Sequence, residues 1–148
     1  MYTVRHLLEE KGNQVWSIAP SATVYEALEL MAAKNCGALL VIEEGTVAGM
    51  FTERDYARQV VLQGRSSKTT KVGELMSTDI LYVRPDDTIE NCMALMTGRR
   101  VRHLPVMDND KLAGVVSIGD IVKAVISDRE FTIRELERYI TGGHSSLK

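Results

Sequence analysis

A glycine, two apolar residues, a threonine or serine, and an aspartate three residues later occur twice in this sequence. The first copy reads Gly49-Met50-Phe51-Thr52-Glu53-Arg54-Asp55, and the second reads Gly114-Val115-Val116-Ser117-Ile118-Gly119-Asp120. The apolar residues predict the end of a strand and the hydroxyl residue predicts the start of a helix. At such a junction, backbone N–H groups and a hydroxyl can hold a phosphate group. A carboxylate one turn further on can accept hydrogen bonds from both hydroxyls of a ribose.

The same two residue types also have a purely structural interpretation. In a capping box, the hydroxyl accepts a hydrogen bond from a backbone N–H while the acidic side chain reaches back to the start of the helix. The positive end of the helix stabilises that acid as well. A single copy of the motif favours this interpretation. Two copies at one register, near arginines, favour a nucleotide site, and the spacing alone leaves both interpretations open.

Both motifs belong to a longer internal repeat. Residues 15–58 align with residues 80–123 without a gap, and nine pairs are identical, where ordinary composition gives roughly two or three. The identical pairs are Pro20/Pro85, Thr23/Thr88, Leu30/Leu95, Met31/Met96, Leu39/Leu104, Val41/Val106, Ala48/Ala113, Gly49/Gly114 and Asp55/Asp120. The chain therefore contains two copies of one unit.

Each copy predicts the element order β-α-β-β-α. The first copy has a strand at 15–18, a helix that begins at Thr23 and is closed by Gly37, strands at 38–42 and 47–51, and a helix from Thr52 to about 62. The second copy has strands at 80–83, 104–107 and 112–116 and helices at 88–99 and 117–127. A unit of about 50 residues has little core of its own, so we expect the two sheets to pack together.

The segments outside the repeat are predicted as follows. Val4–Leu8 resembles Val72–Met76, which predicts a short helix before each unit. The polar stretch at 63–71 is typical of an exposed linker. A helix at 132–140 carries an apolar stripe that needs a partner, in the fold or on another subunit: Ile133, Leu136, Tyr139 and Ile140. We predict an α/β (α+β) fold with repeat units at 8–64 and 73–128 and a C-terminal amphipathic helix at 129–141.

The composition excludes several classes of protein. The chain has 148 residues, of which 45% are hydrophobic and 26% charged, as in ordinary globular proteins. A net charge of -2 and 5% aromatic residues argue against binding to nucleic acid or to an anionic membrane. No apolar run approaches the ~20 residues of a membrane helix. The N-terminus lacks the apolar core of a signal peptide, and two cysteines fit a reducing compartment, so we expect a cytoplasmic protein.

The sequence predicts no catalytic or metal site. His103 follows a basic run that begins at Arg99, but no serine, cysteine or aspartate has nucleophile spacing to it. That run is interpreted as a solvated helix end, with contact to a nucleotide phosphate as the alternative. Cys36 and Cys92 have no zinc-ligand spacing to a histidine. Asp108 and Asp110 suggest a calcium loop, but the glycine and glutamate that such a loop needs are missing.

Taken together, the two copies identify a known family. Pro-x-x-Thr at the start of a helix, then an apolar strand, then the glycine–hydroxyl–aspartate motif, all twice, resembles the tandem cystathionine β-synthase (CBS) domain over about residues 8–128. The run that starts at Thr52, Thr-Glu-Arg-Asp-Tyr-Ala-Arg, resembles stand-alone bacterial CBS pairs of the signal-transduction type. The resemblance implies pseudo-two-fold symmetry and two clefts for an adenosine-containing ligand: AMP, ADP, ATP, S-adenosylmethionine, NAD or NADH.

The resemblance also implies ligand contacts by position. The first cleft takes Thr52, Arg54 and Asp55 for phosphate and ribose, and its other wall takes Arg84, Ile89, Val101, Arg102 and His103. The second cleft takes Ser117, Gly119 and Asp120, opposite Ile18, Ala19, Val24, Cys36, Gly37 and Ala38. Because Arg54 corresponds to Gly119, we expect unequal affinities, with the Asp55 cleft preferring the more phosphorylated ligand and the Asp120 cleft depending on Arg102.

The predicted function is that of a non-enzymatic regulatory module. It binds an adenosine nucleotide, and the bound state is passed to an effector protein by a conformational shift. The resemblance implies a homodimer in which the apolar C-terminal stripe takes part. The alternative is a ligand-free structural or adaptor module that docks on an enzyme or transporter, although degenerate CBS pairs of that kind usually lack the aspartate. The residues leave open which ligand binds, whether both clefts are filled, which partner responds and how the dimer is oriented.

Overall fold

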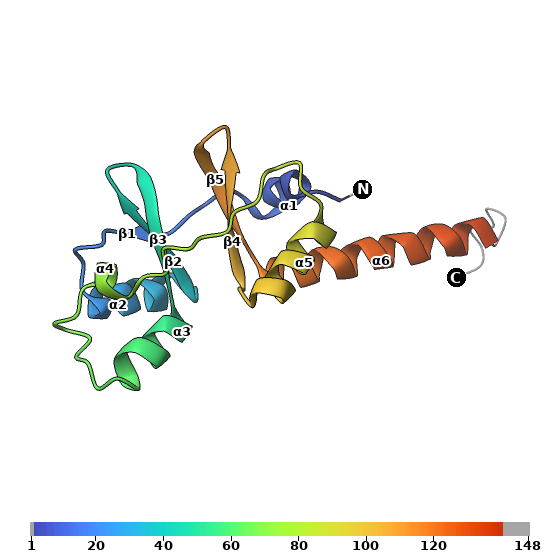
Figure 1. The fold of residues 1–148 in the computed structure, drawn as a ribbon. Coiled ribbons are helices and arrows are strands. Elements are labelled where there is room, and N and C mark those ends of the chain that lie inside the picture. Colours follow the sequence, from blue (N-terminus) through green and yellow to red (C-terminus); the bar gives the residue numbers. More distant parts are fainter. Residues whose placement is uncertain (1, 141–148) are drawn as a thin grey trace. The chain divides into compact units, whose positions relative to one another are not determined.

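The computed structural model describes residues 2–140, and the chain divides into two compact units (Figure 1). We call Gln14–Leu81 the first-repeat unit. The second-repeat unit joins the chain up to Asn13 to the chain from Tyr82 onward. Each unit contains a small sheet and several helices, which confirms the predicted mixed α/β class.

The first-repeat unit has a three-stranded sheet in the order β1-β2-β3. Strand β1 (Ser17–Ile18) runs parallel to β2 (Ala38–Glu43). Strand β3 (Thr46–Thr52) returns antiparallel to β2 and pairs Ala38 with Thr52 at its end. The predicted β-α-β-β order of this copy is confirmed, with a shorter first strand.

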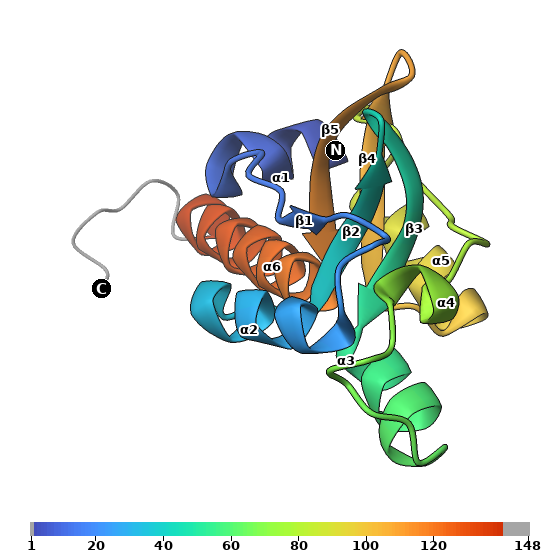
Figure 2. The same ribbon diagram turned by 90° about the vertical axis from the view of Figure 1, so that its left-hand side faces the viewer.

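Helix α2 (Val24–Lys34) begins at its predicted cap. The Thr23 hydroxyl accepts a hydrogen bond from the Glu26 N–H at 3.1 Å, and the Glu26 carboxylate accepts one from the Thr23 N–H at 3.0 Å. The helix ends at Asn35, whose φ of 53° is left-handed, and not at Gly37 as predicted, because asparagine also tolerates this conformation. Figure 2 shows α2 beside β2 of the same unit. The buried face of the helix belongs to the core of this unit, which consists of Val24, Ala27, Met31, Leu39, Val41, Phe51, Val60, Val72 and Leu75.

The second helical segment of this unit is not a regular α-helix. A single turn, α3 (Glu53–Asp55), is followed by the π-helix η1 (Tyr56–Val61). The Leu62 N–H donates to the Ala57 carbonyl, five residues back, at 3.1 Å. The predicted segment is therefore helical over the expected residues but wider than an α-helix. Val60 is still buried in the core.

The second-repeat unit contains the corresponding elements. Helix α5 (Ile89–Arg99) begins after Thr88, whose hydroxyl accepts the Asn91 N–H at 3.1 Å. Strand β4 (His103–Asp108) pairs antiparallel with β5 (Lys111–Ser117). The strand predicted at 80–83 is reduced to a parallel bridge from Val83 to Val106.

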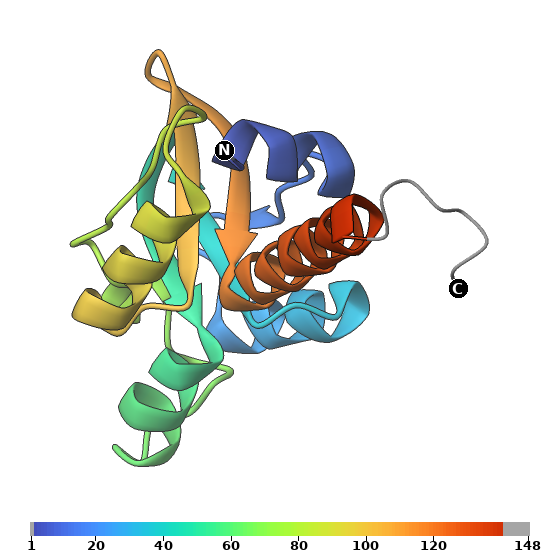
Figure 3. The same ribbon diagram turned by 90° about the vertical axis from the view of Figure 1, so that its right-hand side faces the viewer.

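Helix α6 (Ile118–Ile140) is one continuous helix of 23 residues (Figure 3). The sequence predicted two helices, 117–127 and 129–141, and residue 141 lies outside the described residues. The helix continues because no proline occurs in it and its only glycine, Gly119, lies in the first turn. Its apolar stripe is exposed, at 54% for Ile133, 55% for Leu136, 85% for Tyr139 and 80% for Ile140.

The two short helices pack on the repeat that does not follow them. Helix α1 (Val4–Lys11) belongs to the second-repeat unit, where the N–H groups of Val4 and Arg5 donate to the carbonyls of Asp87 and Pro85, both at 2.9 Å. Helix α4 (Val72–Leu75) belongs to the first-repeat unit. Its equivalent bonds run from Val72 to Ala22 at 2.8 Å and from Gly73 to Pro20 at 2.9 Å. Chain order thus predicts the helices but not the repeat on which each one packs.

Candidate functional site: two hydroxyl–carboxylate junctions

The two motifs form the same local structure in both units. At the end of β3, the Thr52 hydroxyl accepts the Asp55 N–H at 3.1 Å, and Asp55 Oδ2 accepts the Thr52 N–H at 3.0 Å. At the end of β5, the Ser117 hydroxyl accepts the Asp120 N–H at 3.2 Å, and Asp120 Oδ2 accepts the Ser117 N–H at 2.9 Å. The capping-box interpretation is therefore confirmed as geometry at both places. All four residues are half-buried, so each junction presents a fixed hydroxyl and a fixed carboxylate.

The glycine of each motif makes room for a passing segment of the same unit. A Cβ atom at Gly49 would lie 2.7 Å from the Met76 Sδ and 2.7 Å from the Ser77 carbonyl oxygen. A Cβ atom at Gly114 would lie 2.9 Å from a methyl group of Leu8. In both units, the chain at or just after the short helix therefore lies directly against the strand that leads to the junction.

A backbone hydrogen bond ties each junction to the start of the neighbouring strand. The Glu53 N–H donates to the Gly37 carbonyl at 3.0 Å, and the Ile118 N–H donates to the Arg102 carbonyl at 2.8 Å. Each unit therefore brings together its own members of the predicted set. The first-repeat unit joins Cys36, Gly37 and Ala38 to Thr52, Arg54 and Asp55, and the second-repeat unit joins Val101, Arg102 and His103 to Ser117, Gly119 and Asp120. The grouping of residues from different repeats into one cleft stays a prediction.

The remaining predicted site residues differ in their exposure. Arg54, Arg84, Arg102, Ala19 and Gly119 are exposed, while Ile18 is half-buried. Val24 and Ile89 are core residues, with exposed fractions of 0% and 2%. As first residues of α2 and α5, these two pack inward, so any ligand contact that they make would use backbone atoms.

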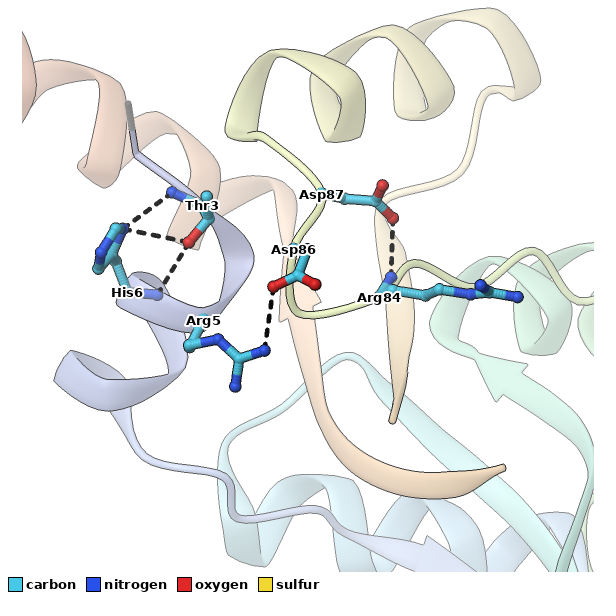
Figure 4. Close-up of polar contacts among 6 residues, drawn as sticks. All are labelled: Thr3, Arg5, His6, Arg84, Asp86 and Asp87. Carbon is cyan, nitrogen blue, oxygen red and sulfur yellow. Dashed lines mark hydrogen bonds and ion pairs between the residues drawn. The ribbon is translucent and has the colours of Figure 1, made fainter. Parts of the chain in front are cut away.

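Arg84 lies at the turn that leads into α5. Its N–H donates to Asp87 Oδ2 at 2.8 Å, while Asp86 forms an ion pair with Arg5 of α1 at 3.0 Å. Figure 4 shows that the Arg84 guanidinium points away from both carboxylates. The positive charge of Arg84 is therefore not neutralised by the acids next to it in the sequence.

The sequence reasoning missed Lys11. The Nζ of this last residue of α1 donates to Asp120 Oδ2 at 2.7 Å and to the Val115 carbonyl at 2.8 Å. Burial raises the pKa of Asp120, but hydrogen bonds from Lys11 and Ser117 and the charge of Lys11 outweigh that effect, so the pKa lies below its ordinary value. No sequence signal linked Lys11 to Asp120, because the repeat alignment begins after residue 11 and chain order assigned α1 to the first repeat.

The two thiols are poor nucleophiles at neutral pH. Burial raises the pKa of Cys92 to about 11, and burial is also the main cause of the raised pKa of Cys36. Within residues 2–140, no group of three histidine, cysteine, aspartate or glutamate side chains could hold a metal ion. No helix in the same range is long and apolar enough to cross a bilayer.

The fold therefore consists of two copies of one unit, and in each copy the last strand is joined to the following helix by a hydroxyl–carboxylate junction. This arrangement defines a class of tandem-repeat proteins. The chain belongs to the CBS domain family, whose model matches residues 11–62 and 72–127. It is 39% identical over 152 residues to the mitochondrial CBS domain-containing protein CBSX3 of Arabidopsis thaliana, covering 96% of this chain and 73% of that protein. A solved candidate signal-transduction protein with CBS domains from Burkholderia ambifaria MC40-6 is 51% identical, with a TM-score of 0.83 over 85% of this chain and 95% of that chain.

Two further solved structures bear on ligands and assembly. The CBS domain pair of protein MJ0100, solved in complex with 5′-methylthioadenosine and S-adenosyl-L-methionine, shares the fold at 18% identity, with a TM-score of 0.77 over 86% of this chain and 98% of that chain. A CBS-CP12 protein from bloom-forming cyanobacteria is hexameric. It is 27% identical to this chain, with a TM-score of 0.72, and the match covers 99% of this chain and 91% of that chain. At least one protein with this fold therefore assembles into a hexamer.

Proposed function

We propose that this CBS pair is a non-enzymatic regulatory module that binds an adenosine-containing ligand at its two junctions. The observation that carries the proposal is the repeated geometry of Asp55 and Asp120. Each carboxylate is fixed by a backbone N–H at Oδ2, and a carboxylate can accept further hydrogen bonds beyond that one. A carboxylate oxygen held in this way can accept the hydroxyls of a ribose, as acidic residues do in dinucleotide folds.

The ligand class follows from the chemistry of these groups. Both molecules bound by the MJ0100 pair contain an adenosine, and the diol of its ribose suits a fixed carboxylate. The exposed arginines Arg84 and Arg102 could add contacts to phosphate. We therefore propose AMP, ADP, ATP, NAD or NADH as ligands of this chain, in the cytoplasm.

Signalling would follow from a population shift. A ligand stabilises the conformation of the pair to which it binds more tightly, by no more than the difference in its affinities for the alternatives. An effector protein that recognises that conformation would then respond to the nucleotide. The proposed module needs no chemical step, in accord with the raised pKa of both thiols.

The test is a thermal-shift panel with AMP, ADP, ATP, NAD, NADH and S-adenosylmethionine. A ligand at 100 times its Kd adds about 2.7 kcal/mol to stability, which is several degrees for a chain of this size. Asp55→Asn and Asp120→Asn keep an oxygen for the capping bond but remove the charge. Asp110→Asn changes an exposed acid in the turn between β4 and β5, outside both junctions, and is the matched control. Each shift is measured against the ligand-free melting temperature of the same variant.

We expect a shift with at least one ligand that is reduced in one or both junction variants and kept in the control. Equal shifts in all variants would mean that the two aspartates are only caps. No shift with any ligand would favour the second candidate function, a ligand-free module that docks on another protein. The exposed apolar stripe of α6 is the observation that favours this second candidate, and it also fits a homodimer.

A further inference from the structure

Lys11 adds a positive charge to one junction from outside the motif. Its side chain is 33% exposed and that of Asp120 is 23% exposed, so the pair lies at the surface of the second-repeat unit within reach of a ligand. An ammonium group has three N–H donors. The bonds to Asp120 and to the Val115 carbonyl use two of them, which leaves one for another acceptor.

The first-repeat unit has a different arrangement at the equivalent place. The match of Val4–Leu8 to Val72–Met76 puts Asp79 in the position of Lys11. Within the motif itself, Arg54 stands where the second copy has Gly119. The first motif therefore carries its own cation, whereas the second motif is joined by a cation from α1.

The geometry points to a role for Lys11 in ligand selection at the Asp120 site, an inference that rests on the proposed function. Asp120 alone would attract the ribose hydroxyls but repel a phosphate group on the same ligand. Lys11, 2.7 Å from that carboxylate, neutralises the repulsion and offers its third N–H to the phosphate. The Asp120 site is therefore selective for phosphate-bearing adenosine ligands over the uncharged nucleoside, and Lys11 is the residue that makes it so.

The selectivity is measured as the ratio of the affinities for AMP and adenosine. These ligands share the base and the ribose and differ in the phosphate alone. Isothermal titration uses the Asp55→Asn background, which leaves the Asp120 site as the one to be measured. Lys11→Met removes the charge at similar length, Lys11→Arg keeps the charge, and Lys123→Met removes an exposed lysine from the same end of α6 as a matched control.

We expect Lys11→Met to lower the ratio of AMP to adenosine affinity about tenfold, in the range of one charge-assisted hydrogen bond at a partly exposed site. The affinity for adenosine should stay equal or rise, because Asp120 Oδ2 is then released. Lys11→Arg and Lys123→Met should both keep the ratio. Circular dichroism of each variant confirms that the fold is retained.

Two results would overturn the inference, and they differ from one another. If Lys11→Met weakens both ligands equally or neither of them, Lys11 is a structural partner of Asp120 and selects nothing. If the unsubstituted chain binds neither AMP nor adenosine, the proposed function fails at these ligands and the inference fails with it. The thermal-shift panel on the unsubstituted chain separates the second case from the first.

Discussion

The ion pair between Lys11 and Asp120 should stabilise the second-repeat unit in a way that depends on pH. Lys11 is the contact of α1 with the β5–α6 junction, and its Nζ lies 2.7 Å from Asp120 Oδ2. Both side chains are partly exposed, so we take the upper end of the range for surface pairs, about 1 kcal/mol. For a chain of this size, that corresponds to a loss of about 2–4 °C in melting temperature on Lys11→Met.

The sign of the pH dependence follows from the pKa of Asp120, which is lower in the folded protein than its ordinary value. A group with a lowered folded-state pKa contributes stability above its unfolded-state pKa of about 3.9 and loses it as the pH falls through the folded-state pKa. We therefore expect Lys11→Met to be less stable than the unsubstituted chain at pH 7. The difference should shrink below pH 4 and vanish once Asp120 is protonated in both proteins.

The assay is a double-substitution cycle followed by thermal denaturation at pH 7 and at pH 3. It compares Lys11→Met, Asp120→Asn and the double variant, and the coupling should be about 1 kcal/mol at pH 7 and smaller at pH 3. Arg5→Met, which breaks the more exposed pair with Asp86, is the control and should change the melting temperature less. Additive single effects at pH 7 would refute the reasoning, because the two side chains would then not interact in solution.

Three further predictions follow from burial and close contacts. Gly49→Ala should destabilise the protein by about 1–3 kcal/mol. The loss should exceed that of Gly114→Ala, because a Cβ at residue 49 meets a backbone oxygen as well as a side chain. Equal melting temperatures for the two variants would contradict this. At pH 8, Ellman's reagent should react with the half-exposed Cys36 well before the buried Cys92, and equal rates would mean that burial does not control them. Leu136→Glu on the exposed face of α6 should lower the average molecular mass of the protein in solution, measured by light scattering, without lowering the melting temperature. An unchanged molecular mass would show that this face is not part of an assembly.

Local signals in the sequence predicted most of the elements. Four hydroxyl residues cap helices as expected: Thr23, Thr52, Thr88 and Ser117. These caps are predictable because a capping side chain accepts a hydrogen bond from an N–H group within three residues of itself. The strands of both hairpins were also predicted, since their apolar runs are bounded by turn residues. These features depend on neighbouring residues, which the sequence displays directly.

The errors concern features that depend on distant residues or on the absence of a stop signal. The stretch from Ser127 to Thr132 is polar enough to suggest a break, but nothing in it prevents helix formation, and α6 continues through it. The packing partner of α1 is decided by its bonds to Pro85 and Asp87, some 80 residues away. Val24 and Ile89, which the resemblance assigns to the ligand, are buried core residues, and their contact with a ligand stays a prediction.

The asymmetry of the two junctions has a structural origin in the lengths of the short helices. Helices α1 and α4 make equivalent backbone bonds to their units, through Arg5 to Pro85 and through Gly73 to Pro20. Helix α4 ends at Leu75, and the chain then turns extended so that Ser77 pairs with Met50. Helix α1 instead continues for one more turn, to Lys11.

That additional turn is what brings a lysine to Asp120. Two identical copies would have bound identical ligands, so a difference in ligand preference requires a difference in charge near the two carboxylates. The first motif contains a cation of its own, Arg54. The cation next to the second motif is Lys11, which belongs to a helix distant in sequence. Because Lys11 lies three residues before Gln14, where the chain enters the first-repeat unit, a ligand that binds Lys11 would also lie close to the segment that joins the two units.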